Sequence, residues 1–249
     1  MKIKAILGTV AAAAITATAA SADIKIGLAA EAYPPFTTKN AAGEWEGWEV
    51  EIKDALCAAI EEECTVVEVA WDGIIPALTS GKIDAIMASM SITEERKQTI
   101  NFSDKYYNTP AVLVAPESLD IDTEDMSGKI VGVQVSTIHQ NYAEKHFDGA
   151  DIKTYSTFDE HNADLSAGRI DAVVGDSLAF SDYLESASDM EVKAELSDEE
   201  VFGPGVGVGL RKEDTELAEK FNAAIKQIRE DGTYDEISAK YFDFDIYGG

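Results

Sequence analysis

The sequence predicts an α/β fold of two lobes, each a mostly parallel sheet flanked by helices. Three observations predict it: an internal repeat, alternating helix-like and strand-like segments, and a glycine-rich stretch before the last helix. In the repeat, residues 71–86 and 158–173 share one pattern, 87 residues apart. Each copy reads aromatic-Asp, five residues, then Leu-x-x-Gly-basic-Ile-Asp-Ala followed by Ile or Val. One structural unit therefore occurs twice.

Each copy of the repeat reads as a helix followed by a buried strand. Gly81 and Gly168 can adopt the left-handed conformation that ends a helix. The predicted strands that follow are Ile83–Met87 and Ile170–Val174, and those that precede the copies are Thr65–Val69 and Ile152–Tyr155. The opening strands of the two lobes are predicted at Ile24–Ala29 and Ile130–Val135. Strands alternating with helices in this way are typical of a parallel sheet covered by helices.

The chain is predicted to cross between the two lobes twice. Lobe 1 comprises residues 23–107 and 206–249, lobe 2 comprises residues 112–197, and the crossings are residues 108–111 and 198–205. An amphipathic helix over residues 213–230 returns the chain to lobe 1. Paired crossings make a hinge, and a hinge suits closure around a ligand.

The N-terminus reads as a cleaved secretory signal over residues 1–22. Lys2 and Lys4 precede a short apolar run, and Ala20-Ser21-Ala22 is a small-residue cleavage site. The mature chain is expected in the periplasm, cut after Ala22. Loss of the two lysines changes the formal net charge from -27 to -29. Such a surface disfavours nucleic acid and anionic membranes, because both are bound through Lys and Arg.

Cysteine and histidine usage indicates a disulfide and no metal site. Cys57 and Cys64 are the only cysteines, and in an oxidising compartment they are expected to form one disulfide. The histidines show no metal-binding spacing. No cofactor is expected.

Four loops are expected to line one cleft. In open α/β sheets ligands bind beyond the carboxyl ends of the strands. The segments that follow the predicted strands there are residues 31–35, 88–91, 136–139 and 175–177.

Ordered motifs add a family resemblance over essentially the whole mature chain. They are Glu31-Ala-Tyr-Pro-Pro-Phe36, Gly47-Trp-Glu-Val-Glu51, Ser89-Met-Ser-Ile-Thr-Glu-Glu-Arg96, Phe102-Ser-Asp104 and Asp231-Gly-Thr-Tyr234. The chain resembles the periplasmic amino-acid-binding proteins of ABC transporters, solute-binding family 3. It is most similar to their lysine/arginine/ornithine- and histidine-binding branch. The resemblance implies the two-lobed periplasmic-binding-protein-like fold of type II.

The resemblance also implies roles for individual residues. Arg96 would hold the ligand α-carboxylate through two parallel hydrogen bonds, and Asp176 would accept from the α-ammonium. Tyr33 and Trp71 would face the ligand side chain, with acid supplied by Glu31 and Glu49. The full implied ligand-binding set is Glu31, Tyr33, Glu49, Trp71, Ser89, Met90, Ser91, Arg96, Gln134, Thr137, His139 and Asp176.

Three positions depart from the family pattern. Glu31 lies two residues before Tyr33 where the pattern has an acid three residues before, Ala88 replaces Ser, and His139 replaces Gln. These departures concern the identity of the ligand and leave its class unchanged.

The function implied is capture of a free amino acid of the arginine, lysine or ornithine class between closing lobes. The protein would act as a monomer and deliver the amino acid to a membrane ABC permease. One alternative is a binder of an opine or other polar or modified amino acid, suggested by Ala88 and Trp71. Another is a dehydratase-type enzyme on the same fold, which would need a positioned acid or base such as Glu49 or His139. A receptor sensor domain would need a membrane-spanning segment after the domain, and none is seen in the sequence.

Overall fold

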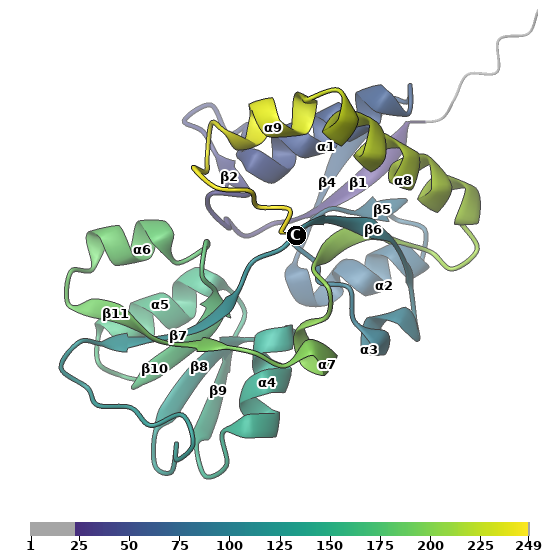
Figure 1. Cartoon of the computed structure of the whole chain (residues 1–249). Coiled ribbons are helices and arrows are strands. Elements are labelled where there is room, and N and C mark those ends of the chain that lie inside the picture. Colours follow the sequence, from purple (N-terminus) through teal and green to yellow (C-terminus); the bar gives the residue numbers. More distant parts are fainter. Residues whose placement is uncertain (1–22, 249) are drawn as a thin grey trace, which may run out of the picture.

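The computed structural model describes residues 23–248, which form two α/β lobes (Figure 1). The predicted signal and its cleavage site lie outside the described residues. In lobe 1 the sheet order is β4-β1-β5-β12-β6. Its strands are β1 Ile24–Ala29, β4 Cys64–Val69, β5 Ala85–Ile86, β6 Asn101–Tyr107 and β12 Val206–Leu210. A separate short ribbon joins β2 Thr38–Lys39 to β3 Trp45–Glu46.

Helices cover both faces of the first sheet. One layer contains α1, α8 and α9, and the other contains η1, α2 and α3 (Figure 1). Their bounds are α1 Trp48–Ala59, η1 Trp71–Gly73, α2 Ile74–Thr79, α3 Glu94–Lys97, α8 Thr215–Glu230 and α9 Thr233–Ser238. On β1, Ile24 and Ile26 pack with the apolar faces of α1 and α8, because alternate side chains of a strand share one face.

Lobe 2 contains a second sheet of order β11-β7-β10-β8-β9. Its strands are β7 Ala111–Pro116, β8 Ile130–Gln134, β9 Asp151–Tyr155, β10 Ala172–Asp176 and β11 Met190–Leu196. Its helices are α4 Ile138–His146, α5 Phe158–Ser166 and α6 Ser181–Ser186. Strand β7 is buried on both faces, with Leu113 in one apolar cluster and Val112 and Val114 in the other.

Both sheets are mixed, whereas the sequence analysis predicted mostly parallel ones. Strands β4, β1 and β5 run parallel, and β12 and β6 add antiparallel pairs. Lobe 2 likewise joins a parallel β9-β8-β10 set to the antiparallel strands β7 and β11. The antiparallel strands are those that carry the chain into or out of a lobe. The predicted parallel arrangement therefore holds for the strands around the repeat and fails for the strands at the crossings.

The two repeat copies have the same internal hydrogen bonds. Asp84 accepts from the backbone N–H of Lys25 at 3.0 Å, and Asp171 accepts from that of Ile130 at 2.7 Å. In each copy the helix is followed by a glycine with positive φ, 74° at Gly81 and 66° at Gly168, as predicted. The predicted strand 83–87 shortens to β5, whereas its partner extends to Asp176 in β10.

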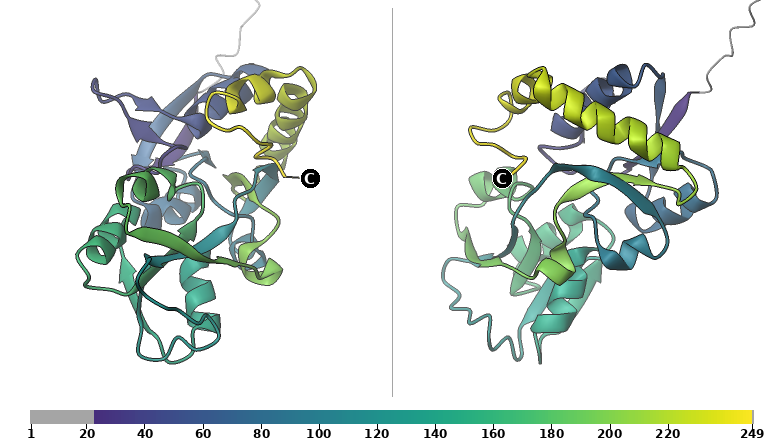
Figure 2. Two further views of the ribbon diagram at one scale, coloured as in Figure 1. Left: turned by 60° about the vertical axis from the view of Figure 1, so that its left-hand side comes forward. Right: turned by 45° about the vertical axis from the view of Figure 1, so that its right-hand side comes forward.

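Two segments connect the lobes (Figure 2). The first runs from β6 to β7, and the C-terminal segment lies beside it, where the Asn108 N–H donates to the Ile246 carbonyl at 2.9 Å. The second runs from β11 to β12 and contains α7 Glu199–Phe202, a helix that the sequence analysis did not predict. Gly203 ends α7 with φ 71°, and a Cβ there would lie 1.9 Å from the Ile92 carbonyl oxygen. Only glycine therefore lets this crossing pass so close to residues 91–96.

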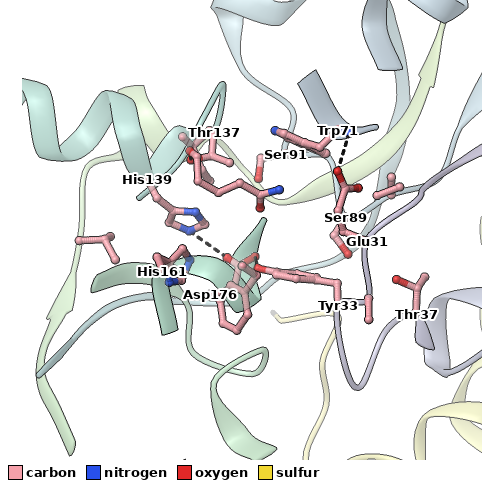
Figure 3. A pocket seen from close by; sticks show the side chains of 18 of the residues that line it. Glu31, Tyr33, Thr37, Trp71, Ser89, Ser91, Thr137, His139, His161 and Asp176 are labelled. Atoms are coloured by element: carbon pink, nitrogen blue, oxygen red, sulfur yellow. Dashed lines mark hydrogen bonds and ion pairs between the residues drawn. The ribbon is translucent and has the colours of Figure 1, made fainter. Parts of the chain in front are cut away.

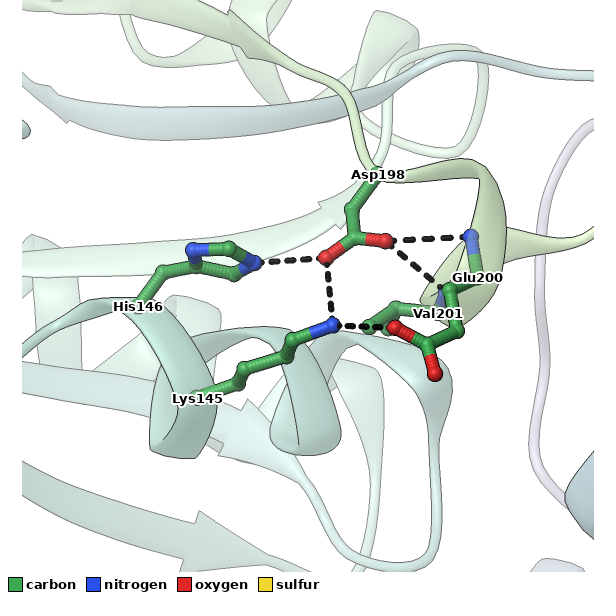
Figure 4. Close-up of polar contacts among 5 residues, drawn as sticks. All are labelled: Lys145, His146, Asp198, Glu200 and Val201. Atoms are coloured by element: carbon green, nitrogen blue, oxygen red, sulfur yellow. Dashed lines mark hydrogen bonds and ion pairs between the residues drawn. The ribbon is translucent and has the colours of Figure 1, made fainter.

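Asp198 fastens the second crossing to lobe 2 (Figure 4). Its carboxylate caps α7 by accepting from the backbone N–H groups of Glu200 and Val201. The same carboxylate pairs with His146 Nε2 at 2.6 Å and Lys145 Nζ at 3.0 Å, both on α4. Hydrogen bonds from His146 and Lys145 hold the pKa of Asp198 well below its usual range.

The predicted disulfide is confirmed: Cys57 of α1 is bonded to Cys64 of β4. Within residues 23–248, no helix has both the length and the apolar character needed to cross a membrane.

Candidate ligand site

A cavity lies between the lobes at the carboxyl ends of the sheet strands (Figure 3). All four segments that the sequence analysis placed at one cleft contribute to its wall. The lining residues are Ala29, Glu31, Ala32, Tyr33, Thr37, Trp71, Ala88, Ser89, Ser91, Arg96, Gln134, Thr137, Ile138, His139, Phe158, His161, Val174, Gly175 and Asp176. Ten of the twelve predicted ligand-binding residues are among them.

Asp176 ends β10 and bonds across the cleft. It is 7% exposed, and its Oδ2 accepts from the Tyr33 hydroxyl of lobe 1 at 2.6 Å. Its Oδ1 lies 3.3 Å from His139 Nε2. Burial and then the charge of Asp176 raise the pKa of Tyr33 well above its usual value, so the phenol stays protonated and donates. Asp176 therefore presents a desolvated carboxylate without a Lys or Arg partner among the described residues.

Arg96 enters the cavity from α3, whose first turn is capped by Thr93. Its guanidinium donates to the Ser91 carbonyl at 2.9 Å and, across the cleft, to the Ser136 carbonyl at 3.3 Å. Its Cζ lies 5.4 Å from the centre of the Trp71 ring. Burial lowers the pKa of Arg96 to about 10, so the side chain remains cationic at neutral pH. A planar cation held in this way suits a carboxylate.

Glu31 and Trp71 form the lobe-1 end of the cavity (Figure 3). The Glu31 Oε1 accepts from the backbone N–H of Trp71 at 3.2 Å. The other carboxylate oxygen, Oε2, is buried without a partner, and so is the indole Nε1 of Trp71. Glu31 therefore reaches the cavity despite its shifted place in the motif.

The lobe-2 wall is fixed by backbone hydrogen bonds. Thr137 caps α4 by accepting from the Gln140 N–H at 3.1 Å, and its hydroxyl donates to the Gln134 carbonyl at 2.7 Å. The Gln134 amide donates in turn to the Ser156 carbonyl at 3.1 Å. These bonds fix the segment that brings Thr137, Ile138 and His139 to the cavity wall.

Glu49 and Met90, which the sequence analysis expected to contact the ligand, do not line the cavity. Glu49 is fully buried in the first turn of α1. Its carboxylate accepts from the Ser89 N–H at 2.8 Å, from the Ser89 hydroxyl at 3.2 Å and from the Tyr106 hydroxyl. Met90 is 1% exposed and packs in the core beneath α2. Met90 follows Ser89, which has a positive φ of 54°, whereas Glu49 is held inside lobe 1 by hydrogen bonds from Ser89 and Tyr106.

The cavity is also lined by five residues outside the predicted set and the four predicted segments: Ala29, Thr37, Phe158, His161 and Val174. The repeat pointed to two of them. Phe158 is the counterpart of Trp71, a predicted ligand-binding residue, and His161 is a polar residue at the position where the first copy has Ile74. Phe158 packs edge-on against Tyr33 across the cleft, with ring centres 5.3 Å apart. Thr37 follows a tight turn with Tyr33 and had no comparable signal.

This arrangement, a cavity lined by charged, hydroxyl and aromatic side chains between two α/β lobes joined by two segments, is that of a two-lobed solute-binding protein. The sequence profile of the bacterial extracellular solute-binding proteins, family 3, matches residues 24–244, and the chain belongs to this family. The family assignment made from the motifs is thus confirmed.

Individual relatives agree with this assignment. The L-arginine-binding protein of Pseudomonas aeruginosa is 43% identical over 258 aligned positions, which cover 100% of this chain and 99% of that protein. The histidine-binding periplasmic protein of Escherichia coli strain K12 is 43% identical over 225 positions, covering 87% and 86%. A solved ancestral arginine-binding protein bound to glutamine is 34% identical, with a TM-score of 0.82 over 89% of this chain and 98% of that one. These relatives are binding proteins, and the chain is a solute-binding protein rather than an enzyme.

Proposed function

We propose that this protein captures a free amino acid with a cationic side chain, best represented by arginine, and delivers it to an ABC importer. The cavity carries the charges that such a ligand needs. Among the described residues that line it, Arg96 is the one Lys or Arg, and Glu31 and Asp176 are the two carboxylates. The α-carboxylate of an amino acid pairs with Arg96 and its α-ammonium pairs with Asp176. One acid, Glu31, is then left for the side chain.

The unpaired carboxylate oxygen of Glu31 is the observation that carries the proposal. A buried polar atom without a partner is costly, so the bound ligand is expected to supply a donor to Oε2. The ring of Trp71 lies beside Glu31 and offers a face on which a guanidinium stacks better than an ammonium does. The arginine- and histidine-binding relatives support a cationic ligand. Cross-cleft bonds such as Tyr33 to Asp176 support closure of the lobes around it.

Calorimetry on the parent protein and on Glu31→Gln tests this function. Arginine should bind the parent more tightly than glutamine does, and glutamate should be rejected. Glu31→Gln should weaken arginine by about ten- to a hundredfold, the range of a hydrogen bond to a charged group, and leave glutamine nearly unchanged. Glu219→Gln, on the exposed surface of α8, is the matched control. A parent protein that prefers glutamine to arginine would remove the cationic assignment.

One observation favours a second candidate, an opine or another modified amino acid. The Trp71 indole N–H is buried without an acceptor, and a bare guanidinium offers none. A side chain that bears a carbonyl or carboxylate oxygen would satisfy it. Citrulline, whose side chain ends in a urea carbonyl, tests this candidate in the same titration series, since it should then outcompete arginine. Octopine carries its added carboxylate on the α-nitrogen and is titrated separately as the opine arm of the test.

A further inference from the structure

His161 is a buried histidine that lines the cavity from α5. His161 is 1% exposed, and its side chain packs among aromatic rings. The ring centres of Phe158, Tyr155 and Phe180 lie 4.8, 6.1 and 6.3 Å from its own. Figure 3 shows the ring on the lobe-2 wall, beside Asp176 and His139.

Neither ring nitrogen of His161 has a described partner with hydrogen-bond geometry, although the neighbouring Asn162 side chain, whose Oδ1 is also unpartnered, lies close enough to raise the pKa of the ring against the effect of burial. Burial lowers the pKa of His161 to about 3, so the ring is neutral at physiological pH and has one N–H donor and one lone pair. Buried polar atoms left unpaired cost free energy, and most of those in proteins have partners. A core-filling role does not explain a polar ring here.

The internal repeat shows what the fold alone requires at this position. The counterpart of His161 in lobe 1 is Ile74, which is 1% exposed and packs in the core. An aliphatic side chain therefore serves the helix–sheet packing in the first copy. The second copy has a polar ring at the same place, and that ring faces the cavity.

We propose that His161 is a specificity-determining residue whose lone pair accepts a hydrogen bond from the ligand α-ammonium, beside Asp176. The inference rests on the proposed function, which places the ammonium at that carboxylate. A primary ammonium has three N–H donors, and one carboxylate does not satisfy all three. His139 also approaches Asp176, at 3.3 Å, and lies close enough to His161 to lower its pKa further. The neutral imidazole supplies an acceptor without adding a second charge.

A ligand pair that differs only in the ammonium tests the role. Arginine and 5-guanidinopentanoic acid, its des-amino analogue, are titrated by calorimetry into the parent, His161→Leu, His161→Asn and His161→Gln. His161→Leu should weaken arginine by about ten- to a hundredfold and change the analogue little. Asn and Gln place an amide oxygen near the positions of Nδ1 and Nε2 respectively. The variant that matches the accepting nitrogen should recover most of the arginine affinity.

Each outcome decides the proposal. Equal weakening of both ligands in His161→Leu means that the ring only packs, and parent-like arginine binding means that the ring contributes nothing; either overturns the role. If the parent binds glutamine and not arginine, the cationic function fails. Glutamine and its des-amino analogue, glutaramic acid, then carry the same test. If the parent binds none of these amino acids, both conclusions fail.

NMR resonances of the histidine ring nitrogens test the proposal in the parent protein, so no substituted variant has to fold. The sequence has three histidines, so few ring signals compete. The accepting nitrogen of His161 should shift when arginine binds and stay in place when 5-guanidinopentanoic acid binds. Identical His161 spectra with the two ligands at saturation would overturn the proposal.

Discussion

Replacement of Glu49 by alanine should destabilise the fold instead of changing ligand preference. The carboxylate holds Ser89, whose φ of 54° is unusual for a residue other than glycine. It accepts from the Ser89 N–H at 2.8 Å and from the Tyr106 hydroxyl. Alanine would leave these two buried donors without an acceptor.

The expected magnitude follows from the two lost acceptors. Each unsatisfied buried donor costs about 1–3 kcal/mol, which gives a loss of about 2–6 kcal/mol in the free energy of unfolding. For a chain of this length each kcal/mol shifts Tm by about 2–4 °C, so Tm should fall by about 5–20 °C. Ser89 lines the cavity, and its displacement should weaken arginine and glutamine by similar factors.

Thermal and urea unfolding measure the stability change, and calorimetry with both amino acids measures binding. Glu219→Ala is the control, because an exposed substitution on α8 should stay within about 0.5 kcal/mol of the parent. A Glu49→Ala protein that unfolds like the parent and loses arginine alone would contradict this reasoning. Glu49 would then be the charge partner of the ligand.

Glu49 should also change how the free energy of unfolding depends on pH. Burial raises its pKa in the folded protein. Between the usual Glu pKa, about 4.3, and that raised value, the folded state binds more protons than the unfolded state. Stability contributed by this group is therefore present at low pH and is lost as pH rises through the raised pKa. Comparison with Glu49→Gln isolates the slope, because glutamine does not titrate; parallel curves would contradict the raised pKa.

Two further substitutions test the role of Arg96 and the second segment that connects the lobes. Arg96→Ala should weaken arginine by about 2–5 kcal/mol while the protein still folds, because the ligand carboxylate loses its buried partner. Near-normal calorimetric affinity would remove Arg96 from the site. Asp198→Ala should cost about 1 kcal/mol of stability through loss of the α7 cap. That contribution is present above the usual Asp pKa, about 3.9, and should vanish as pH falls below it because the folded pKa is lowered; a difference from the parent that persists at lower pH would contradict this.

The periodic and repeated parts of the fold could be predicted from the sequence. The strand predicted at Ile24–Ala29 matches β1, and both repeat glycines end their helices as expected. These features depend on local patterns that the chain carries in one stretch. The antiparallel crossing strands could not be predicted in the same way, because β12 pairs with strands that are far from it in the sequence, and the short helix α7 has no periodic pattern of its own.

The cleft was predicted from the carboxyl ends of the strands. That rule identifies the segments that line a cleft, but it does not determine the direction of each side chain. Arg96, Asp176 and Tyr33 face the cavity as expected. Glu49 was assigned from its motif, yet its side chain is buried from the first turn of α1 and accepts from the Ser89 N–H and the Tyr106 hydroxyl, two groups that are distant in the sequence. Glu31 lies outside the usual spacing and still reaches the cavity, since Trp71 holds it there through a backbone bond.

The repeat separates what the fold requires from what the cleft uses. Paired positions that agree, such as Asp84 and Asp171, make the same backbone hydrogen bond in each lobe. Two residues of lobe 2 that differ from their counterparts line the cavity: Asp176, opposite Ser89, and His161, opposite the core residue Ile74. Two lobes with one packing plan can therefore present different groups, a hydroxyl from one side and a carboxylate with an imidazole from the other. A ligand with distinct ends is held in one orientation by such a cleft, and an amino acid has ends of that kind.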